Sequence, residues 1–385
     1  MRLAIITTHP IQYYAPVFRL LHETSKIEIK VFYTWGKQAE NKFDPGFNKT
    51  INWDVPLLEG YPFEWAHNTS RDPGSHHFSG IVNPDLIEQI TAYQPNAILV
   101  IGWAYHGHLK VIRHFKNKIP VLFRGDSTLL DEKPGIKRCA RSILLKWIYK
   151  HIDHAFYAGS NSKAYFKKYG LKETQLTFVP HAIDNQRFAL SKPDEAKLLR
   201  QTLQIKDNDI LILFAGKFED KKDPLLLLHA FLKINNPNAK LLFVGNGKLE
   251  QQLKEEAKGL ANIHFMDFQN QSYMPVLYHA CDVFCLPSKG PGETWGLAVN
   301  EAMACGKPIL VSDKTGCAID IVKPGINGAI FKAGDLASMA NTLNRMLNKK
   351  QAGLAEMGKH SGEIIADWSF KKQVQAIEAY MQAQL

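Results

Sequence analysis

Short runs of aliphatic and β-branched residues alternate with longer helical patterns along this sequence of 385 residues. A regular alternation of strands and helices is typical of parallel sheets that carry helices on both faces, and it leaves few other folds open. The predicted strands are Leu3–Thr7, Ile27–Tyr33, Ala97–Ile101, Val121–Arg124, Ala155–Ala158, Ile210–Ala215, Lys240–Val244, Val283–Leu286 and Pro308–Ser312. The predicted fold class is therefore α/β.

The alternation is interrupted near Pro180, where a strand pattern is cut and polar residues follow. Because domains usually hold roughly 100 to 200 residues, a chain of this length is expected to form two. We place the first domain at residues 1–187 and the second at 188–366, and we expect residues 367–385 to form a helix that packs back on the first. Two doubly wound halves in tandem predict a cleft, with ligands at the carboxyl ends of the strands.

The composition fits a globular enzyme, with 45% apolar and 22% charged residues. Met1–His9 has too few apolar residues for a signal peptide, and no later stretch reaches the roughly 18 uncharged apolar residues that a membrane span needs. The five cysteines are scattered and never in C-x-x-C spacing, which favours reduced, buried thiols. We therefore expect a cytoplasmic protein, either free or peripheral on the inner face of a membrane.

The net charge of +10 is unevenly spread, because eight of the excess positive charges lie in residues 1–188. Between Lys110 and Lys150 the sequence has eleven Lys and Arg and three acids. Its last part, Lys133–Lys150, predicts a basic amphipathic helix. We expect an anionic membrane surface or a phosphorylated acceptor as its partner, and no nucleic acid; a solvated helix face is the alternative.

The most informative stretch is Ser288–Pro308, in which a loop rich in Gly and Pro precedes a predicted helix at about Trp295–Cys305. Free N–H groups and the positive dipole end of a helix bind phosphate, here on residues 294–297. Glu293 and Glu301 are eight residues apart, so in a helix they would be separated by about 12 Å of rise. Carboxylates at that distance can accept hydrogen bonds from both ends of a nucleotide sugar, whereas two solvated helix carboxylates are the alternative.

This stretch resembles the signature of family 4 of the retaining GT-B glycosyltransferases, Glu-x-x-Gly-Leu-x-x-x-Glu-Ala, which Glu293 to Ala302 matches position by position. The resemblance extends to Val179–Asp184, Gly216–Lys222, Leu242–Gly247 and the closing Asp367-Trp-Ser-Phe. It implies a GT-B fold of two tandem Rossmann-like domains, with the acceptor domain first and the nucleotide-sugar domain second. It also implies that Glu293 acts near the reacting sugar and that Glu301 holds the ribose.

The same resemblance assigns the other contacts to the sugar donor. Lys217 and Lys222 take the places of a basic pair that neutralises the diphosphate, so no metal is expected, although Lys in place of Arg loses the bidentate fork. The cosubstrate is a UDP- or GDP-sugar, and the sequence leaves this choice open. The predicted sugar-donor residues are Gly216, Lys217, Lys222, Gly245, Gly247, Thr294, Trp295, Gly296, Leu297 and Glu301.

In the first half the candidate residues follow predicted strands. Asp126 stands six residues beyond Pro120, where many members of the family carry His. Asp126 is a candidate base for the acceptor hydroxyl, with Arg124 beside it, and His106 or His108 is the alternative source of an imidazole. The predicted acceptor contacts are His9, Trp103, His108 and Arg124. The spacing of His106 and His108 also fits zinc, but no third ligand with suitable spacing accompanies them.

The expected activity is transfer of a sugar, with retention at the anomeric carbon, to a saccharide or lipid-linked acceptor in glycan or cell-surface polysaccharide biosynthesis. A catalytically inactive nucleotide-sugar binding protein is one alternative, because Asp126 departs from the family pattern. A metal-dependent GT-A transferase is another, because Asp207-Asn-Asp209 has the D-x-D pattern, although it precedes a strand as a polar turn. A Rossmann oxidoreductase is a weaker alternative, because Gly245-Asn-Gly247 lacks the third glycine.

Overall fold

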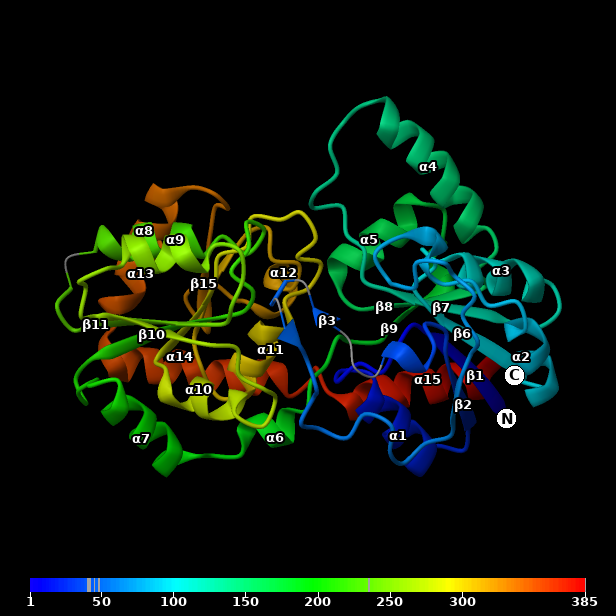
Figure 1. The fold of residues 1–385 in the computed structure, drawn as a ribbon, viewed down its shortest axis with the longest axis horizontal. Coiled ribbons are helices and arrows are strands. Elements are labelled where there is room, and N and C mark those ends of the chain that lie inside the picture. Colours follow the sequence, from blue (N-terminus) through cyan, green and yellow to red (C-terminus); the bar gives the residue numbers. More distant parts are fainter. Residues whose placement is uncertain (40–42, 45, 48, 235, 385) are drawn as a thin grey trace. The chain divides into compact units, whose positions relative to one another are not determined.

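The structure, a computed structural model, describes residues 1–385 except 40–42, 45, 48, 235 and 385. Within the described residues the chain divides into two compact units (Figure 1). The first unit consists of Met1–Lys42, Val55–His181 and Phe370–Leu385, and the second of Phe43–Asp54 and Ala182–Ser369. Residues 182–187 thus lie with the second unit, whereas the sequence analysis placed them in the first domain.

The first unit contains a parallel sheet. Its strands are β1 (Arg2–Thr7), β2 (Glu28–Tyr33), β5 (Phe63–Trp65), β6 (Ala97–Ile101), β7 (Val121–Gly125), β8 (His154–Tyr157) and β9 (Leu176–Phe178), in the order β5-β2-β1-β6-β7-β8-β9. Its α-helices are α1 (Ala15–Thr24), α2 (Leu86–Tyr93), α3 (His106–Phe115), α4 (Ile136–Tyr149), α5 (Ser160–Lys168) and α15 (Phe370–Gln384). Short 3-10 turns lie at η1 (Lys37–Ala39), η2 (Phe78–Gly80) and η3 (Glu173–Gln175).

Successive residues of β1 face opposite sides of this sheet, so both faces are buried. Ala4 and Ile6 pack with residues of α2, α3, α4 and α5. Leu3 and Ile5 pack on the other face, with α1 and with apolar residues of α15 such as Ile377. Each aliphatic side chain buried in this way stabilises the fold by roughly 1.5–3 kcal/mol. The continuous apolar runs of the sequence follow from this two-sided burial.

The second unit contains its own parallel sheet. The strands are β10 (Ile210–Ala215), β11 (Ala239–Val244), β12 (Ile263–Met266), β13 (Val283–Leu286), β14 (Ile309–Ser312) and β15 (Gly328–Phe331), in the order β12-β11-β10-β13-β14-β15. The helices are α6 (Asn185–Ala189), α7 (Pro193–Thr202), α8 (Pro224–Leu232), α9 (Glu250–Glu256), α10 (Met274–Ala280), α11 (Leu297–Ala304), α12 (Ala318–Ile321), α13 (Leu336–Leu347) and α14 (Lys350–Ile365). Figure 1 shows α8, α9 and α13 on one side of this sheet and α7 and α10 on the other.

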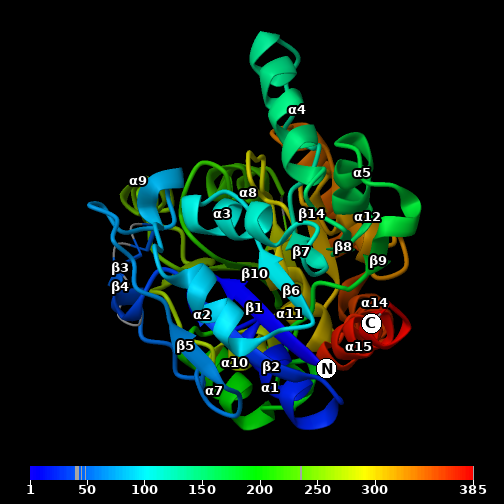
Figure 2. The same cartoon turned by 90° about the vertical axis from the view of Figure 1, so that its right-hand side faces the viewer.

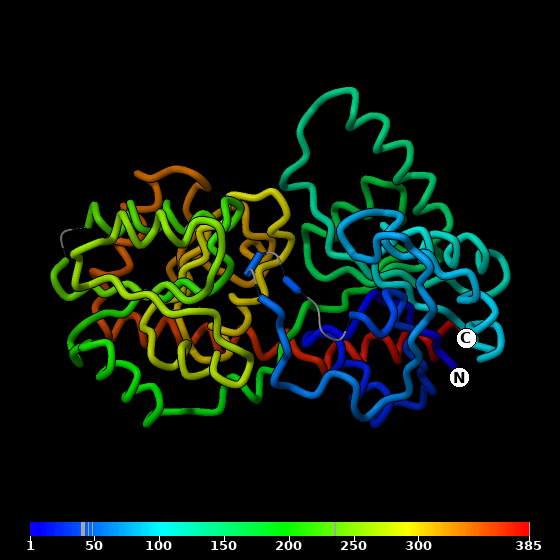
Figure 3. The backbone as a smooth tube through the Cα atoms, in the orientation of Figure 1, coloured from blue at the N-terminus to red at the C-terminus, as the bar shows by residue number. Residues whose placement is uncertain are grey.

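A segment from the first half of the sequence belongs to the second unit. We call residues 43–54 the strap; it contains the antiparallel pair β3 (Phe43–Asp44) and β4 (Lys49–Thr50). The strap, in blue, lies beside the chain that follows β12 (Figure 3). Asn270 donates its amide to the Asn52 carbonyl over 2.7 Å. No sequence pattern indicated that this segment leaves the first domain.

Two further expectations concern helices and cysteines. Among the described residues, none of the helices combines the length and the apolar character that crossing a bilayer requires. The five cysteines are unpaired, and four of them are buried. Cys139 is exposed on α4, which corrects the expectation that all the thiols are buried.

Candidate functional site

Two loops at the carboxyl edge of the second unit's sheet bring a lysine and a glutamate together. Lys222 lies between β10 and α8, and Glu293 lies between β13 and α11. The Lys222 ammonium donates to Oε2 of Glu293, and the Ser288 hydroxyl donates to the same oxygen over 2.8 Å. Glu293 is only 7% exposed, so its charge is held largely away from water. The sequence analysis missed Ser288, although its place just after β13 was a usable signal.

A second lysine at this edge is paired with the strap. The Lys217 ammonium donates to both carboxylate oxygens of Asp44, over 2.7 and 2.9 Å. Burial acts to raise the pKa of Asp44, but the ion pair with Lys217 and the N–H groups of Gly46 and Phe47 lower this pKa overall. The ionised Asp44 carboxylate therefore forms an ion pair with Lys217. A phosphate group could take the place of this carboxylate as the partner of the lysine. No motif marks Asp44, so the sequence analysis did not select it.

The glycines of this edge allow two neighbouring loops to touch. Gly216 follows β10, and Gly245 and Gly247 follow β11. A Cβ on Gly245 would lie 2.0 Å from the carbonyl oxygen of Gly216, and one on Gly247 would lie 2.6 Å from that of Phe218. In this structure the close approach thus joins protein loops, and the role of these glycines in sugar-donor binding stays a prediction.

Helix α11 begins at Leu297, two residues later than predicted. Gly296 precedes it with a φ of 96°, a conformation that glycine adopts without steric strain. Glu293 consequently lies in the loop and not in the helix, so the helical separation predicted for Glu293 and Glu301 does not apply. The first turn of α11 still points its N–H groups toward the loop that carries Glu293.

Trp295 packs inside the second unit. Its indole N–H donates to the Asn300 side chain over 2.8 Å, and its ring centroid lies 5.0 Å from that of Trp368. The side chain is 5% exposed, so Trp295 could take part in sugar-donor binding only through its backbone N–H, which is the role predicted for residues 294–297. Its neighbours Thr294 and Leu297 are half-buried and stay candidates.

Glu301 lies on α11 with its carboxylate oriented by a tyrosine. The Tyr278 hydroxyl donates to Oε2 of Glu301 over 2.8 Å. Tyr278 is fully buried and Glu301 is 3% exposed. A carboxylate fixed in this way can accept hydrogen bonds from ribose hydroxyls at little cost in side-chain entropy, and this role stays a prediction.

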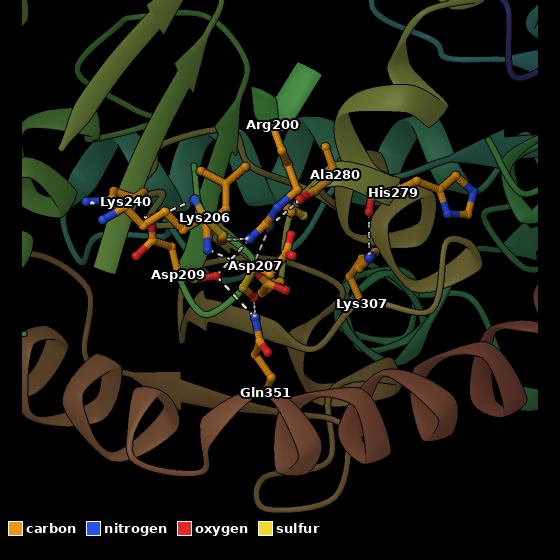
Figure 4. A network of polar contacts seen from close by, with 12 residues as sticks. Arg200, Lys206, Asp207, Asp209, Lys240, His279, Ala280, Lys307 and Gln351 are labelled. Carbon is orange, nitrogen blue, oxygen red and sulfur yellow. Dashed lines mark hydrogen bonds and ion pairs between the residues drawn. The ribbon is translucent and has the colours of Figure 1, made fainter. Parts of the chain in front are cut away.

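The D-x-D sequence lies in a turn just before β10, at the amino end of that strand (Figure 4). The Asp209 carboxylate accepts from the N–H of Lys206 over 2.8 Å, and Arg200 donates to the Asp209 carbonyl over 2.8 Å. Gln351 donates to the carbonyl of Asp207. These residues therefore stabilise a turn at the edge opposite Lys222 and Glu293, which contradicts the GT-A alternative.

In the first unit, Asp126 follows β7 and lies beside a histidine that the sequence analysis did not select. Nε2 of His181 lies 3.9 Å from Oδ2 of Asp126. The Asp126 side chain is 52% exposed and that of His181 is 6% exposed. Burial lowers the pKa of His181 more than the Asp126 carboxylate raises it. His181 belongs to the Val179–Asp184 stretch that the family resemblance includes, so a signal was present.

Arg124 does not face a ligand. Its guanidinium donates to the carbonyls of Val179 and Pro180, over 2.8 and 3.2 Å, and it lies over the ring of Tyr14. Arg124 is 3% exposed. The prediction that Arg124 contacts the acceptor is therefore wrong, because the guanidinium holds the chain around His181 in place.

The two histidines of the H-x-H pattern have different surroundings. Nε2 of His108 lies 2.7 Å from the Thr34 hydroxyl, and Nδ1 lies 2.7 Å from the Gly102 carbonyl oxygen. Burial lowers the pKa of His108 to about 4. Because both of its ring nitrogens are engaged inside the fold, the prediction that His108 contacts the acceptor is wrong, and His108 is not available as a zinc ligand either. His106 is exposed at the start of α3, and its ring lies 6.0 Å from that of Phe78.

His9 and Trp103 lie at the same edge of the first unit's sheet as Asp126. His9 follows β1, Trp103 follows β6 and Asp126 follows β7, and these strands are neighbours in the sheet. His9 bonds the Thr8 hydroxyl over 2.8 Å. His9 and Trp103 are both half-buried, so each side chain is part of the edge at which the acceptor is expected.

A cluster with potential metal ligands lies elsewhere in the first unit. Asp72, His76 and His77 each place one ligand atom within 4.8 Å of the others. Of the residues that the structure describes, no other such group of three His, Cys, Asp or Glu was found. This cluster belongs to the first unit, whereas Lys217, Lys222 and Glu293 belong to the second.

Comparison with known proteins identifies a family model that matches part of the second unit, and several curated relatives of the chain. Residues 195–362 match the family model described as glycosyl transferases group 1. The chain is 30% identical to lipopolysaccharide 1,2-N-acetylglucosaminetransferase of Salmonella typhimurium, over 57% of this chain and 59% of that protein. It is 24% identical to GDP-mannose-dependent monoacylated alpha-(1-6)-phosphatidylinositol monomannoside mannosyltransferase of Corynebacterium glutamicum, over 59% and 61% of the two chains. Matches to three curated relatives span 46%, 61% and 45% of their lengths.

The fold is similar to that of solved structures over the whole chain. HepE of Anabaena in complex with UDP and glucose has a TM-score of 0.72 and 18% identity, with 100% of both chains covered. Sucrose-phosphate synthase from Thermosynechococcus elongatus has a TM-score of 0.73 and 20% identity, with 100% of this chain and 99% of the other covered. The predicted GT-B fold with two Rossmann-like units is confirmed.

Proposed function

We propose that this protein transfers a sugar from a nucleotide diphosphate sugar to a saccharide or lipid-linked acceptor, because residues 195–362 match the family model of glycosyl transferases group 1. The proposed setting is glycan or cell-surface polysaccharide biosynthesis, as the names of the two curated relatives suggest. The transfer proceeds with retention at the anomeric carbon. The observation that carries this proposal is the placement of Lys217, Lys222 and Glu293 at one edge of the family-matched unit.

The lysines stabilise the leaving group. When the bond between the anomeric carbon and the phosphate oxygen breaks, negative charge collects on the diphosphate. Lys217 and Lys222 are fixed cations at the carboxyl edge, where they lower the energy of that state without a divalent ion. Glu293, beside Lys222, holds the sugar hydroxyls, and Glu301 holds the ribose.

Asp126 serves the acceptor. Its exposed carboxylate accepts a hydrogen bond from the acceptor hydroxyl and takes up its proton as the oxygen bonds to the anomeric carbon and the bond from that carbon to the diphosphate breaks. His181, buried behind Asp126, positions this carboxylate. A binding protein without activity has no need of such a pair, so the geometry favours an enzyme.

A thermal-shift screen with UDP-sugars and GDP-sugars tests sugar-donor binding. Both nucleotides are included because one relative is named as GDP-mannose-dependent and one similar structure contains UDP. A ligand at 100 times its Kd stabilises the folded protein by about 2.7 kcal/mol. If no nucleotide sugar raises the Tm, the proposed function is wrong.

Release of free nucleotide in the presence of EDTA tests the metal-free mechanism. With an acceptor present, we expect the release rate to stay within twofold of the rate without EDTA. Loss of activity in EDTA that Mn²⁺ or Mg²⁺ restores would show that Lys217 and Lys222 are insufficient.

Variants of the acceptor pair test the role of Asp126. Asp126→Asn is expected to lower kcat about 100-fold or more, as for loss of a general base, with an unchanged Kd for the sugar donor. His181→Gln is expected to lower kcat less and to shift the pH profile of kcat, because it acts through Asp126. Asp85→Asn, an exposed carboxylate of the same unit, is the control and should match the parent. A parental kcat for Asp126→Asn would exclude this residue as the base.

The protein acts in the cytoplasm at the inner face of a membrane under this proposal. The support is the basic helix α4, on which Lys137, Arg138 and Lys146 are exposed. Between Lys133 and Lys150 the sequence has no acid. Such a surface attracts anionic lipid, and a lipid-linked acceptor would be presented there.

A further inference from the structure

The first unit has a cavity of about 560 Å³ beside the strand edge that carries the acceptor residues. It lies between the turn at residues 75–78, the loop from β6 to α3, and helix α4. Most of the side chains that line it are apolar or aromatic: Phe78, Trp103, Tyr105, Leu109, Leu144 and Ile148. Ser75, His76 and His77 add a polar part. A mostly apolar cavity with one polar side suits an amphiphile with a hydrocarbon chain.

Apolar side chains continue from this cavity along the outer part of α4. Leu144 lines the cavity and is nevertheless 46% exposed. Ile143 is 72% exposed and Trp147 is 40% exposed, and Ile136 near the start of the helix is 89% exposed. Figure 2 shows that α4 stands away from the sheet of its unit. Exposed apolar residues that adjoin an apolar cavity mark a binding surface more strongly than isolated ones do.

The charges around this surface favour an anionic ligand. Lys137, Arg138, Lys146 and Lys150 are exposed on or directly after α4. Because the stretch that contains them has no acid, their positive charge is not balanced within the helix. The ligand that fits is a hydrocarbon chain joined to a phosphate or another anionic group.

The cavity also lies close to the proposed acceptor base. Tyr105 lines the cavity, and its hydroxyl donates to the Ser75 carbonyl over 3.3 Å. Burial and, second, the negative charge of Asp126 raise the pKa of Tyr105. Trp103, which also lines the cavity, follows β6, and Asp126 follows the neighbouring strand β7. A chain in the cavity would place the group attached to it at the edge that carries Asp126.

We propose that this cavity binds the hydrocarbon chain of an anionic, lipid-linked acceptor, whose polar head then lies beside Asp126. The inference rests on the proposed function and adds the class of acceptor to it. It differs from docking of α4 on a membrane surface, because a single chain enters the protein.

Alkyl phosphates provide the probes. Isothermal titration calorimetry with the full chain compares inorganic phosphate, butyl phosphate and decyl phosphate, the last below the concentration at which it forms micelles. Each buried methylene tightens binding roughly fourfold, so we expect decyl phosphate to bind at least 100-fold more tightly than butyl phosphate. Inorganic phosphate is expected to bind more weakly than either.

Two pairs of variants locate the chain. Ala104 lines the cavity and is exposed, and Ala104→Phe fills the cavity, whereas Ala140→Phe makes the same change elsewhere on the surface. Leu144→Glu places a carboxylate at the cavity, and Leu198→Glu makes the same change at a 63% exposed leucine of the second unit. We expect Ala104→Phe and Leu144→Glu to weaken decyl phosphate binding at least tenfold, and the two controls to stay within threefold.

Equal affinities for decyl and butyl phosphate, or parental binding by Ala104→Phe, would overturn the proposal. Binding to anionic vesicles without binding to monomeric decyl phosphate would overturn it as well and would assign α4 to membrane docking. Thermal shifts by nucleotide sugars, measured on the same samples, separate the two hypotheses. If nucleotide sugars bind and decyl phosphate does not, only the cavity inference fails; if no nucleotide sugar binds, the proposed function fails.

Discussion

At the scale of single residues, two glutamates of the same motif have different surroundings. Glu301 accepts a hydrogen bond from the Tyr278 hydroxyl, whereas Glu293 is paired with Lys222. Glu301→Ala is expected to weaken binding of the free nucleotide 10- to 100-fold, the effect of losing a hydrogen bond to a charged group. Glu293→Ala is expected to lower kcat chiefly, because Lys222 stays available to the diphosphate. Calorimetry with nucleotide and single-turnover kinetics measure the two effects, and equal behaviour of both variants would contradict the assignment.

A buried histidine makes stability depend on pH. The folded pKa of His108 is about 4, below its ordinary value near 6.5, so the unfolded chain binds more protons between these values. The contribution of neutral His108 to the free energy of unfolding is therefore fully present above about pH 6.5, and it is lost as the pH is lowered toward 4. From pH 7 to pH 5 we expect His108 to account for a loss of about 2 kcal/mol. Urea unfolding at both pH values should show a smaller loss for His108→Gln, and an identical loss in both proteins would show that His108 is protonated in the fold.

At the scale of an element, the strap contributes Asp44, whose carboxylate forms an ion pair with Lys217 of the predicted sugar-donor site. If Lys217 binds the diphosphate as proposed, the diphosphate has to replace the Asp44 carboxylate, to which the Lys217 ammonium donates both of its described hydrogen bonds. Asp44→Asn removes this competing charge, so we expect the Kd for the nucleotide to fall two- to fivefold, a modest change because both side chains are partly exposed. Asp54→Asn, at the other end of the strap, is the control, since it bonds Ser272 and not a lysine. Weaker nucleotide binding by Asp44→Asn would instead show that Asp44 helps to hold the ligand.

At the scale of the whole molecule, the net charge of +10 predicts salt-dependent binding to anionic vesicles. Each basic residue near such a surface contributes about 1 kcal/mol. Replacing Lys137, Arg138 and Arg141 with Gln should therefore abolish co-sedimentation at low salt. The control variant replaces Lys233, Lys258 and Lys359 of the second unit and carries the same net charge. Equal loss of binding in both variants would mean that overall charge, and not α4, attracts the membrane.

The folding elements could be predicted because their signals are local. Runs such as Ile210–Ala215 are apolar throughout, since a strand of a covered parallel sheet is buried on both faces. The motif from Glu293 to Ala302 can likewise be recognised from ten consecutive residues. The start of α11 was predicted too early because the positive φ of Gly296 depends on the loop around it.

The sequence by itself determined the α/β class, the existence of two halves, and the residue types at the carboxyl edge of the second sheet, because periodicity and motif spacing are properties of neighbouring residues. Only the tertiary structure decided which of these groups meet. It placed Asp44 on Lys217 across 173 positions of the chain and His181 beside Asp126. It also showed that the side chains of His108, Arg124 and Trp295 are buried in the interior. Such outcomes depend on burial and on contacts between distant segments, and neither is encoded in spacing along the chain.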